Sequence, residues 1–460
     1  MRPNILFIMT DQQRFDTFSM NNPVIKTPNF DKLIGESIFF KNAYCSNPSC
    51  VPSRAAIMTG KMPSECQCPA YITELPIEET TFMARLRDNC GYHTAVIGKQ
   101  HFAESKIDKG YVYENIIDGH GAFAKDATVK KYIDFLESNG IDPETIYKKS
   151  CISGGEWLVD EKYHLDNFIG DLGKEWISNQ DSTSETPWFF TLSFPGPHHP
   201  YDLEGTKYSD MYKLEDMTLP ETSFEDLAQK PPHFTKMDSY ANIYLKDYTK
   251  EQFQKSKRAY YANMSLIDEK VGEVIALLKE KDLYDNTLIF FTSDHGDFMG
   301  DFGMVEKLQC LTDSLMRVPM FIKPPVKDFE ACQIDDEILN IDIASTCLNC
   351  AEGEVPELLS NFAYNCYWDK NYEMKKRPYI FMEARDIKGV LIDGIKVVSY
   401  INRDYGEIYD MNKDKKEVTN LWNEPAYQEI KTKALQIIIN EMYKSIPKHE
   451  IVWNYGTPEI

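Results

Sequence analysis

Four short apolar segments, far apart along the chain, each run into polar residues of the kinds that enzymes use. They are residues 5–9, 94–98, 188–194 and 287–292. Apolar runs of this length are typical of strands buried on both faces of a parallel sheet, and in such sheets functional groups gather at the carboxyl ends of the strands. The sequence therefore predicts an α/β fold with an active site along one edge of a buried sheet.

Length and composition indicate a globular enzyme of more than one structural unit. The chain has 460 residues, of which 42% are hydrophobic and 27% charged, and this length predicts two or three units. No apolar run approaches the ~20 residues that a membrane span needs. The N-terminus lacks the features of a secretory signal, and eleven irregularly spaced cysteines fit a reducing compartment, so we expect a cytoplasmic location.

The net charge restricts the partners. The formal charge is −22, from 50 basic and 72 acidic residues, which argues against nucleic acid and against an anionic membrane surface. An enzyme that binds an anionic substrate would need a local cationic pocket to overcome this field. The candidates for that pocket are a metal cation, Arg54, Lys99 and Lys307.

The stretch around Cys50 is the most distinctive part of the sequence. Pro48 and Pro52 predict a turn that presents Cys50 at the start of a helix. Ser53 is expected to cap that helix, and Arg54 lies in its first turn beside the cysteine. A nucleophile at a helix N-terminus is placed where developing negative charge is favoured. The alternative is a buried cysteine in an ordinary turn followed by a helix.

Two pairs of potential metal ligands, Asp-Gln and Asp-His, follow the expected buried strands. Asp11 and Gln12 follow residues 5–9 after Thr10, and Asp294 and His295 follow residues 287–292 after Ser293. Carboxylate and amide oxygens are ligands that calcium and magnesium accept. Taken alone, each Asp is also compatible with capping a loop or the turn that follows its strand.

Basic residues stand at the ends of the other two strands. Lys99 and His101 are predicted to lie on the same face of an extended segment, where both can reach one anion. His198 and His199 lie between prolines that restrict the backbone, and a histidine can protonate a leaving alkoxide near neutral pH. Individually, a surface lysine or a packed histidine is the simpler interpretation of each residue.

Taken together, these motifs resemble those of the type I, formylglycine-dependent sulfatases of the alkaline-phosphatase-like superfamily. The segments that carry the resemblance are Cys50-Val51-Pro52-Ser53-Arg54, Gly98-Lys99-Gln100-His101, Pro197-His198-His199-Pro200 and Ser293-Asp294-His295-Gly296, in that order along the chain. The resemblance implies a large mixed, mostly parallel sheet sandwiched by helices. It also implies that a maturation enzyme oxidises Cys50 to formylglycine, whose hydrate is the nucleophile.

The resemblance also implies a role for each site residue. One divalent cation would be bound by Asp11, Gln12, Asp294 and His295 together with position 50. Arg54 and Lys99 would stabilise charge on the nucleophile and the sulfate, His101 would hydrogen-bond the hydrated aldehyde, His198 would contact the scissile ester oxygen, and Lys307 would bind sulfate and the leaving oxygen. Gln12 stands where the family more commonly has a second Asp. The oxygen-rich set favours calcium, with manganese or magnesium as alternatives.

The last part of the chain differs from the rest. Short apolar segments separated by turn residues predict an antiparallel meander between residues 379 and 409, and a helix is expected at 426–444. We therefore predict a catalytic domain over residues 1–375 and a C-terminal subdomain over residues 376–460. The apolar segment 451–453 suggests a contact with a second copy of the chain, hence a possible homo-oligomer.

The sequence thus predicts a sulfuric ester hydrolase that acts on a small sulfated substrate, with a carbohydrate or a small organic alcohol as the alcohol. Some relatives with the same nucleophile and similar metal pairs hydrolyse phosphonate monoesters or phosphodiesters, which is the first alternative. A catalytically silent, sulfatase-like binding protein is the second. The identity of the alcohol is not contained in these motifs, because loops form that pocket.

Overall fold

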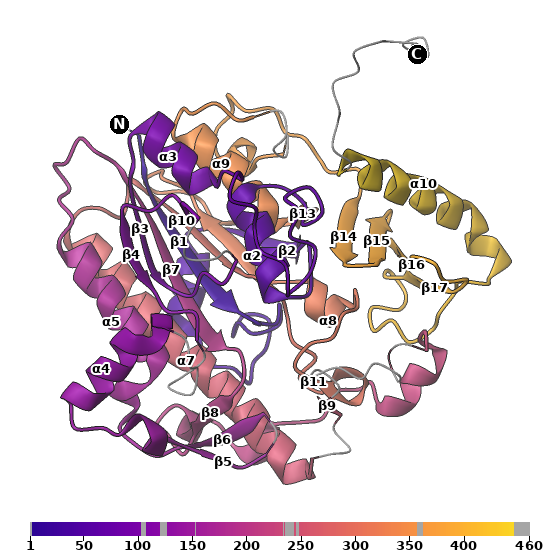
Figure 1. Cartoon of the computed structure of the whole chain (residues 1–460), viewed down its shortest axis with the longest axis horizontal. Helices are drawn as coiled ribbons and strands as arrows, with labels where there is room; N and C mark the ends of the chain where they lie inside the picture. Colours follow the sequence, from indigo (N-terminus) through magenta and orange to yellow (C-terminus); the bar gives the residue numbers. More distant parts are fainter. Residues whose placement is uncertain are drawn as a thin grey trace.

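The computed structural model describes residues 2–102, 107–119, 127–151, 153–232, 234, 243–244, 248–356 and 362–445 (Figure 1). The segment 451–453, which we considered for oligomer contacts, lies outside these residues. No helix in the part of the chain so described is long and apolar enough to cross a membrane.

An eight-stranded sheet forms the centre of the molecule. Its order is β13-β2-β12-β10-β1-β7-β3-β4, and all neighbours are parallel except for β12, which is antiparallel to both of its neighbours. The strands are β1 (Asn4–Asp11), β2 (Ile38–Tyr44), β3 (His93–Gly98), β4 (Tyr113–Ile116), β7 (Trp188–Pro197), β10 (Thr287–Ser293), β12 (Met320–Lys323) and β13 (Cys332–Leu339). The predicted mixed, mostly parallel sheet is confirmed.

Alternate residues of β1 show why the apolar runs are unbroken. Ile5, Phe7 and Met9 pack into the hydrophobic core on one face of the sheet, and Leu6 and Ile8 pack into the core on the other. Side chains on a strand point alternately to its two faces, so a strand covered on both sides must be apolar throughout.

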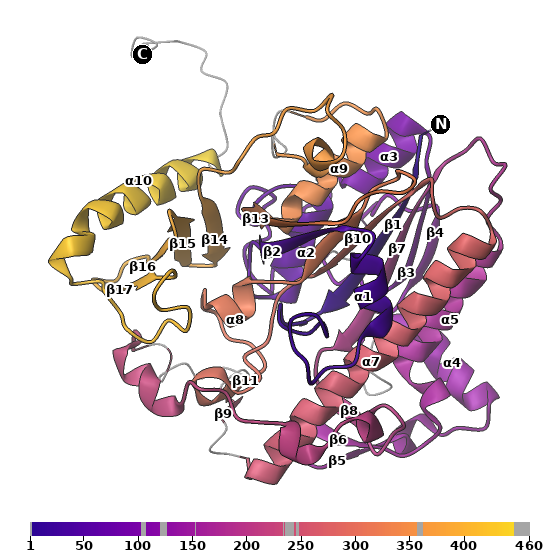
Figure 2. The same ribbon diagram turned by 180° about the vertical axis from the view of Figure 1, so that it is seen from behind.

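Helices cover both faces (Figures 1 and 2). One core contains residues of α2 (Cys50–Thr59), α3 (Phe82–Cys90) and α9 (Ile343–Cys350). The other contains residues of α1 (Pro28–Ile34), α4 (Lys130–Ser138), α5 (Leu165–Ser178) and α7 (Lys250–Glu280). Helix α7, which has 31 residues, directly precedes β10 along the chain.

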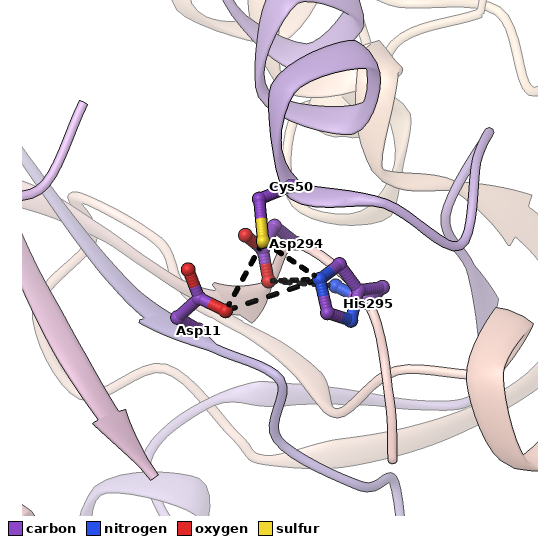
Figure 3. Close-up of side chains that lie close together, drawn as sticks. All are labelled: Asp11, Cys50, Asp294 and His295. Atoms are coloured by element: carbon purple, nitrogen blue, oxygen red, sulfur yellow. Dashed lines mark hydrogen bonds and ion pairs between the residues drawn. The ribbon is translucent and has the colours of Figure 1, made fainter. Parts of the chain in front are cut away.

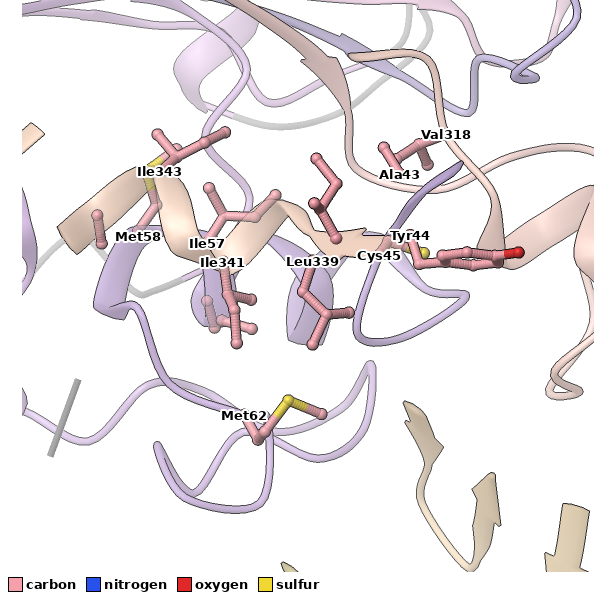
Figure 4. Packing of buried hydrophobic residues seen from close by; sticks show 14 of the residues in the cluster. Ala43, Tyr44, Cys45, Ile57, Met58, Met62, Val318, Leu339, Ile341 and Ile343 are labelled. Carbon is pink, nitrogen blue, oxygen red and sulfur yellow. The ribbon is translucent and has the colours of Figure 1, made fainter. Parts of the chain in front are cut away.

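Helix α2 carries Cys50 into the interior. All ten of its residues are buried, and its apolar side chains pack with residues of β2 and of the segment joining β13 to α9 (Figure 4). The expected capping role of Ser53 is wrong. The N-cap position is Ser49, and Ser53, one turn inside the helix, donates its hydroxyl proton to the Asp294 carbonyl at 2.6 Å.

The C-terminal region forms a separate antiparallel sheet, as predicted, with α10 (Gln428–Lys444) packed against it (Figure 1). Its strands are β14 (Ile380–Ala384), β15 (Ile387–Ile392), β16 (Ile395–Tyr400) and β17 (Gly406–Asp410). Glu383 of β14 holds the loop before Cys50, because its N–H donates to Ser46 O at 2.9 Å and its carbonyl accepts from Asn47 Nδ2 at 2.7 Å. The small sheet therefore supports the site, while the boundary at residue 375 stays a prediction.

Smaller elements complete the fold. A three-stranded sheet is formed by residues between α4 and α7 along the chain, and a two-stranded ribbon and a short helix precede β12. They are β5 (Tyr147–Lys149), β6 (Gly154–Trp157), β8 (Tyr201–Glu204), β9 (Ile243–Tyr244), β11 (Met304–Val305) and α8 (Asp313–Met316).

Candidate active site

Four side chains meet at the carboxyl edge of the large sheet (Figure 3). Asp11 is the last residue of β1, Asp294 and His295 directly follow β10, and Cys50 is the first residue of α2. One potential ligand atom from each residue lies within 4.8 Å of the others. All four residues are fully buried.

Parallel pairing explains how residues almost 300 positions apart come together. Thr10 of β1 lies opposite Ser293 of β10, so the residues that follow both strands emerge side by side. The Gln12 N–H then donates to Asp294 Oδ1 at 3.0 Å. The Asp11-Gln12 and Asp294-His295 pairs recognised in the sequence therefore belong to one site.

The His295 ring is held in one orientation. Its Nδ1 lies 2.9 Å from the Gly296 carbonyl oxygen, which places the proton on Nδ1 and leaves the Nε2 lone pair for the site. Nε2 lies 3.2 Å from Cys50 Sγ. Only glycine fits at position 296, because a Cβ there would lie 2.0 Å from the Ser314 carbonyl oxygen.

Three cationic side chains surround this centre. Lys307 Nζ lies 3.1 Å from Cys50 Sγ and 2.8 Å from Gln12 Oε1. Lys99 Nζ lies 2.5 Å from Asp11 Oδ2. Arg54 reaches both carboxylates, with Nε 2.7 Å from an Asp294 oxygen and Nη2 3.3 Å from an Asp11 oxygen. The pocket is therefore locally cationic, although the protein as a whole has a strongly negative net charge.

These charges change the acidity of the buried groups. Burial by itself would raise the pKa of Asp11, but the charges of Lys99, His198, Arg54 and Lys307 lower it well below its usual value. Burial and Asp11 would raise the pKa of the Cys50 thiol, but Lys307, Lys99 and His295 lower it well below its usual value. The pocket therefore favours negative charge at position 50.

His198 is joined to the centre through Lys307. Its Nδ1 lies 2.7 Å from the His199 carbonyl oxygen, and its Nε2 lies 2.8 Å from Lys307 Nζ. The neighbouring His199 has Nδ1 3.3 Å from Glu306 Oε2. His198 is therefore linked to Cys50 through Lys307, which contacts both residues.

The placement of His101 differs from the expected one. Its φ of 48° puts it in the left-handed region, so Lys99 and His101 do not share a face of one extended segment. The His101 N–H donates to Asp118 Oδ1 at 2.8 Å, and its ring meets the edge of Tyr71 with centroids 5.5 Å apart. Its Nδ1 is buried without a hydrogen-bond partner among the described residues.

Several residues of the site lie outside the motifs recognised in the sequence. Tyr71 is half-exposed, its ring contacts that of His101, and its pKa is raised by burial and by the negative charge of Cys50. Ser193 Oγ lies 3.1 Å from Arg54 Nη1, and Asp297 Oδ2 lies 2.5 Å from Gln12 Nε2. In the sequence, only its position beside Lys307 indicates that Glu306 lies near the site.

The donor set fits a divalent cation. Two carboxylates and an imidazole with a directed lone pair are common ligands of calcium, magnesium and manganese. Asp11 Oδ2 is engaged by Lys99 and Arg54, while Oδ1 faces Cys50 Sγ at 3.6 Å and His295 Nε2 at 3.9 Å. Burial and the charge of Asp11 raise the pKa of Asp294, and a bound cation would favour the charged form of this carboxylate.

Comparison with known families agrees with this geometry. The family model described as sulfatase matches residues 3–353, and the model described as N-sulphoglucosamine sulphohydrolase, C-terminal, matches residues 300–444. The chain belongs to the sulfatase family. The predicted family and the predicted enzyme class, a sulfuric ester hydrolase, are confirmed.

Individual relatives of this sulfatase extend over its whole length. An arylsulfatase of Clostridium perfringens is 30% identical over 463 residues, which cover 96% of this chain and 95% of the relative. The solved phosphonate monoester hydrolase of Agrobacterium radiobacter superposes with a TM-score of 0.81 at 19% identity, covering 97% and 96% of the two chains. A solved structure in complex with its substrate D-glucosamine-2-N,6-O-disulfate gives a TM-score of 0.78 at 19% identity, covering 97% and 98%. These two structures share the fold.

Proposed function

We propose that this sulfatase cleaves a sulfate monoester with a formylglycine made from Cys50. The observation that carries the proposal is the position of Cys50 Sγ, at 3.1 Å from Lys307 Nζ and 3.2 Å from His295 Nε2, where an anion is favoured. When formed, the hydrated aldehyde supplies the nucleophilic oxygen for attack on sulfur.

Asp11, Gln12, Asp294 and His295 are proposed to hold one divalent cation, together with position 50. The bound cation would neutralise sulfate oxygens and lower the cost of bringing an anion into a buried site. The predominance of oxygen ligands favours Ca²⁺, and the imidazole also suits Mn²⁺, with Mg²⁺ as a further alternative.

The remaining residues bind the sulfate and move protons. Lys99 and Lys307 stabilise charge on the sulfate, and Arg54 fixes the two aspartates through its buried contacts. His198 or Lys307, whose nitrogens are 2.8 Å apart, protonates the departing alcohol oxygen. His101 is proposed to accept the proton of the second hydroxyl at position 50.

The mass of the peptide that contains Cys50 tests the nucleophile. The chain is expressed with and without a formylglycine-generating enzyme, which we propose as its maturation partner. We expect the peptide to lose sulfur and gain oxygen only with that enzyme, and turnover of 4-nitrophenyl sulfate to follow the degree of conversion. Full turnover by protein with an unmodified thiol would contradict the proposal.

The substrate is proposed to be a sulfated sugar. The structural relative described above was solved with a sulfated glucosamine as its substrate. The phosphonate monoester hydrolase with the same fold supports a second activity, on phosphonate monoesters or phosphodiesters. Matched sulfate and phosphonate esters of one alcohol, compared by kcat/KM on one preparation, distinguish the two activities.

Location and assembly remain predictions of the sequence. A cytoplasmic enzyme would need its maturation partner in the same compartment. A homo-oligomer would appear as a mass of two or more chains in light scattering.

A further inference from the structure

The start of α2 is tied to the rest of the fold on both sides of Cys50. On the helix side, Ser53 Oγ donates to the Asp294 carbonyl at 2.6 Å. On the loop side, the Ser49 N–H donates to Asn47 Oδ1 at 3.0 Å, an asparagine turn that fixes the backbone directly before Cys50. Because the Ser49 side chain makes no capping hydrogen bond, the Asn47 amide is the side chain that holds the loop at this point.

The Asn47 amide is in turn held by the C-terminal sheet. Its Nδ2 donates to the carbonyl of Glu383 in β14 at 2.7 Å, and the Glu383 N–H donates to the Ser46 carbonyl at 2.9 Å. Ser46, Asn47 and Glu383 are all fully buried. Polar groups buried in this way lose free energy when a partner is removed, so the two partners of the Asn47 amide fix it in one orientation.

Glu383 also holds the chain that follows α2. Its Oε1 accepts a hydrogen bond from the Ser64 N–H at 2.7 Å, and its Oε2 pairs with Lys388 of β15. The charge of Lys388 compensates for the burial of the Glu383 carboxylate. One residue of the small sheet thus contacts the chain both before α2, through its backbone, and after α2, through its side chain.

The position held in this way is the one on which the chemistry depends. Cys50 Sγ lies 3.1 Å from Lys307 Nζ and 3.2 Å from His295 Nε2. Lys307 and His295 follow β11 and β10, so they do not move with the loop that precedes α2. Misplacing a reacting group by about 1 Å can cost about 10²-fold in rate, and a small shift of this loop is therefore enough to weaken catalysis.

We propose that Asn47, held by Glu383, is a positioning residue for the nucleophile, and that the C-terminal sheet is thereby part of the catalytic unit. The inference rests on the proposed role of Cys50 as the source of the nucleophile and deepens it. Lys99 and Lys307, which bind the sulfate in the proposed function, do not lie on this loop. Loss of the Asn47 bridge should therefore lower kcat and leave KM nearly unchanged.

The test is Asn47→Ala, assayed with 4-nitrophenyl sulfate. We expect kcat to fall by about 10- to 100-fold, with KM within about twofold of the wild type. The kcat is expressed per formylglycine, counted from the mass of the Cys50 peptide, so that incomplete maturation does not lower it. The matched control is Asn365→Ala. Asn365 is also a buried asparagine, whose amide bonds with Thr346 and Asn349 beside α9, and this variant should lose stability in urea and keep its kcat.

Asn47→Ser is a milder variant that separates the two bonds of the amide and decides the question if Asn47→Ala does not fold. Serine keeps an acceptor for the Ser49 N–H but is too short to reach the Glu383 carbonyl, so its kcat should stay at least about threefold below that of the wild type.

Wild-type kcat in either Asn47 variant, with only stability reduced, overturns the inference, because the bridge would then serve the fold alone. A higher KM at unchanged kcat overturns it as well, since that profile indicates substrate binding. Failure of the matured wild type to hydrolyse any sulfate ester would instead refute the proposed function, and the inference with it.

Discussion

The active site and the junction with the C-terminal sheet both bury lysines against carboxylates, but they use these charges differently. At the junction, Lys230 is fully buried, 3.4 Å from Glu407 and over the rings of Phe302 and Tyr409. Burial lowers the pKa of Lys230, although Glu407 opposes the shift. In the active site, burial would lower the pKa of Lys307, but Cys50, Asp11 and Asp294 raise it well above its usual value.

The difference separates structural charges from functional ones. Lys230 is enclosed by one carboxylate and aromatic faces, an arrangement that contributes to holding two parts of the fold together. Lys307, Lys99 and Arg54 instead surround one point, Cys50 Sγ, with more positive charge than the nearest carboxylate neutralises. Substitutions of Lys230 at the junction should therefore change stability, and substitutions of Lys307, Lys99 or Arg54 in the active site should change turnover.

The largest effect is expected for Cys50→Ala. This change removes the precursor of the nucleophile, so turnover of sulfate esters should fall by ~10⁴-fold or more, the scale seen when a covalent nucleophile is removed. The melting temperature should stay close to that of the wild type, because alanine keeps the helix start and adds no volume. Initial rates and thermal denaturation of the same preparation check both statements, and retained activity would exclude Cys50 as the nucleophile.

Lys307→Met should reduce kcat/KM by about 10²–10³-fold, the usual consequence of losing one donor that stabilises transition-state charge. Because Lys307 also contacts His198, the loss should be greater for alkyl sulfates than for 4-nitrophenyl sulfate, whose leaving group needs no proton. A loss of equal size on both kinds of ester would limit Lys307 to sulfate binding.

Lys230→Met should change stability and leave turnover nearly unchanged, the opposite of what we expect for Lys307→Met. The change removes the lysine of a buried ion pair, while Tyr400 and Tyr409 still donate hydrogen bonds to Glu407. It is expected to lower the free energy of unfolding by roughly 3–5 kcal/mol. The kcat of the folded fraction should remain near that of the wild type. Urea denaturation and active-site titration measure the two quantities, and a selective fall in kcat would contradict the division between the two regions.

The sequence predicts the active site far better than the junction, for physical reasons. Asp11, Asp294 and Lys99 each follow a buried strand, and parallel strands bring their carboxyl ends to one edge, so position along the chain implies position in space. Lys230 and Glu407 follow no such rule. Their pairing depends on how the C-terminal sheet docks, which no local pattern encodes.

Local geometry limited the prediction within the site itself. His101 is in the family motif, but its left-handed φ turns it away from the face of Lys99. Ser53 looked like a helix cap, but α2 begins three residues earlier and makes it an interior residue. Tyr71 lies in a turn outside the helices and strands, and Glu306 directly follows the short strand β11, so no pattern in the sequence marks either residue.

A smaller effect is expected behind His198, where buried polar groups support a catalytic loop. Asn263 Nδ2 donates to Asp166 Oδ2 at 2.8 Å, and Asp166 Oδ1 accepts from the Gly196 N–H at 3.2 Å. Asn263→Ala should lower kcat about tenfold, since a small displacement of His198 weakens proton transfer. The control is Asn365→Ala, because Asn365 is a buried asparagine beside α9, and this variant should lose stability without a lower kcat. Equal kcat in the two variants would show that Asn263 does not position His198.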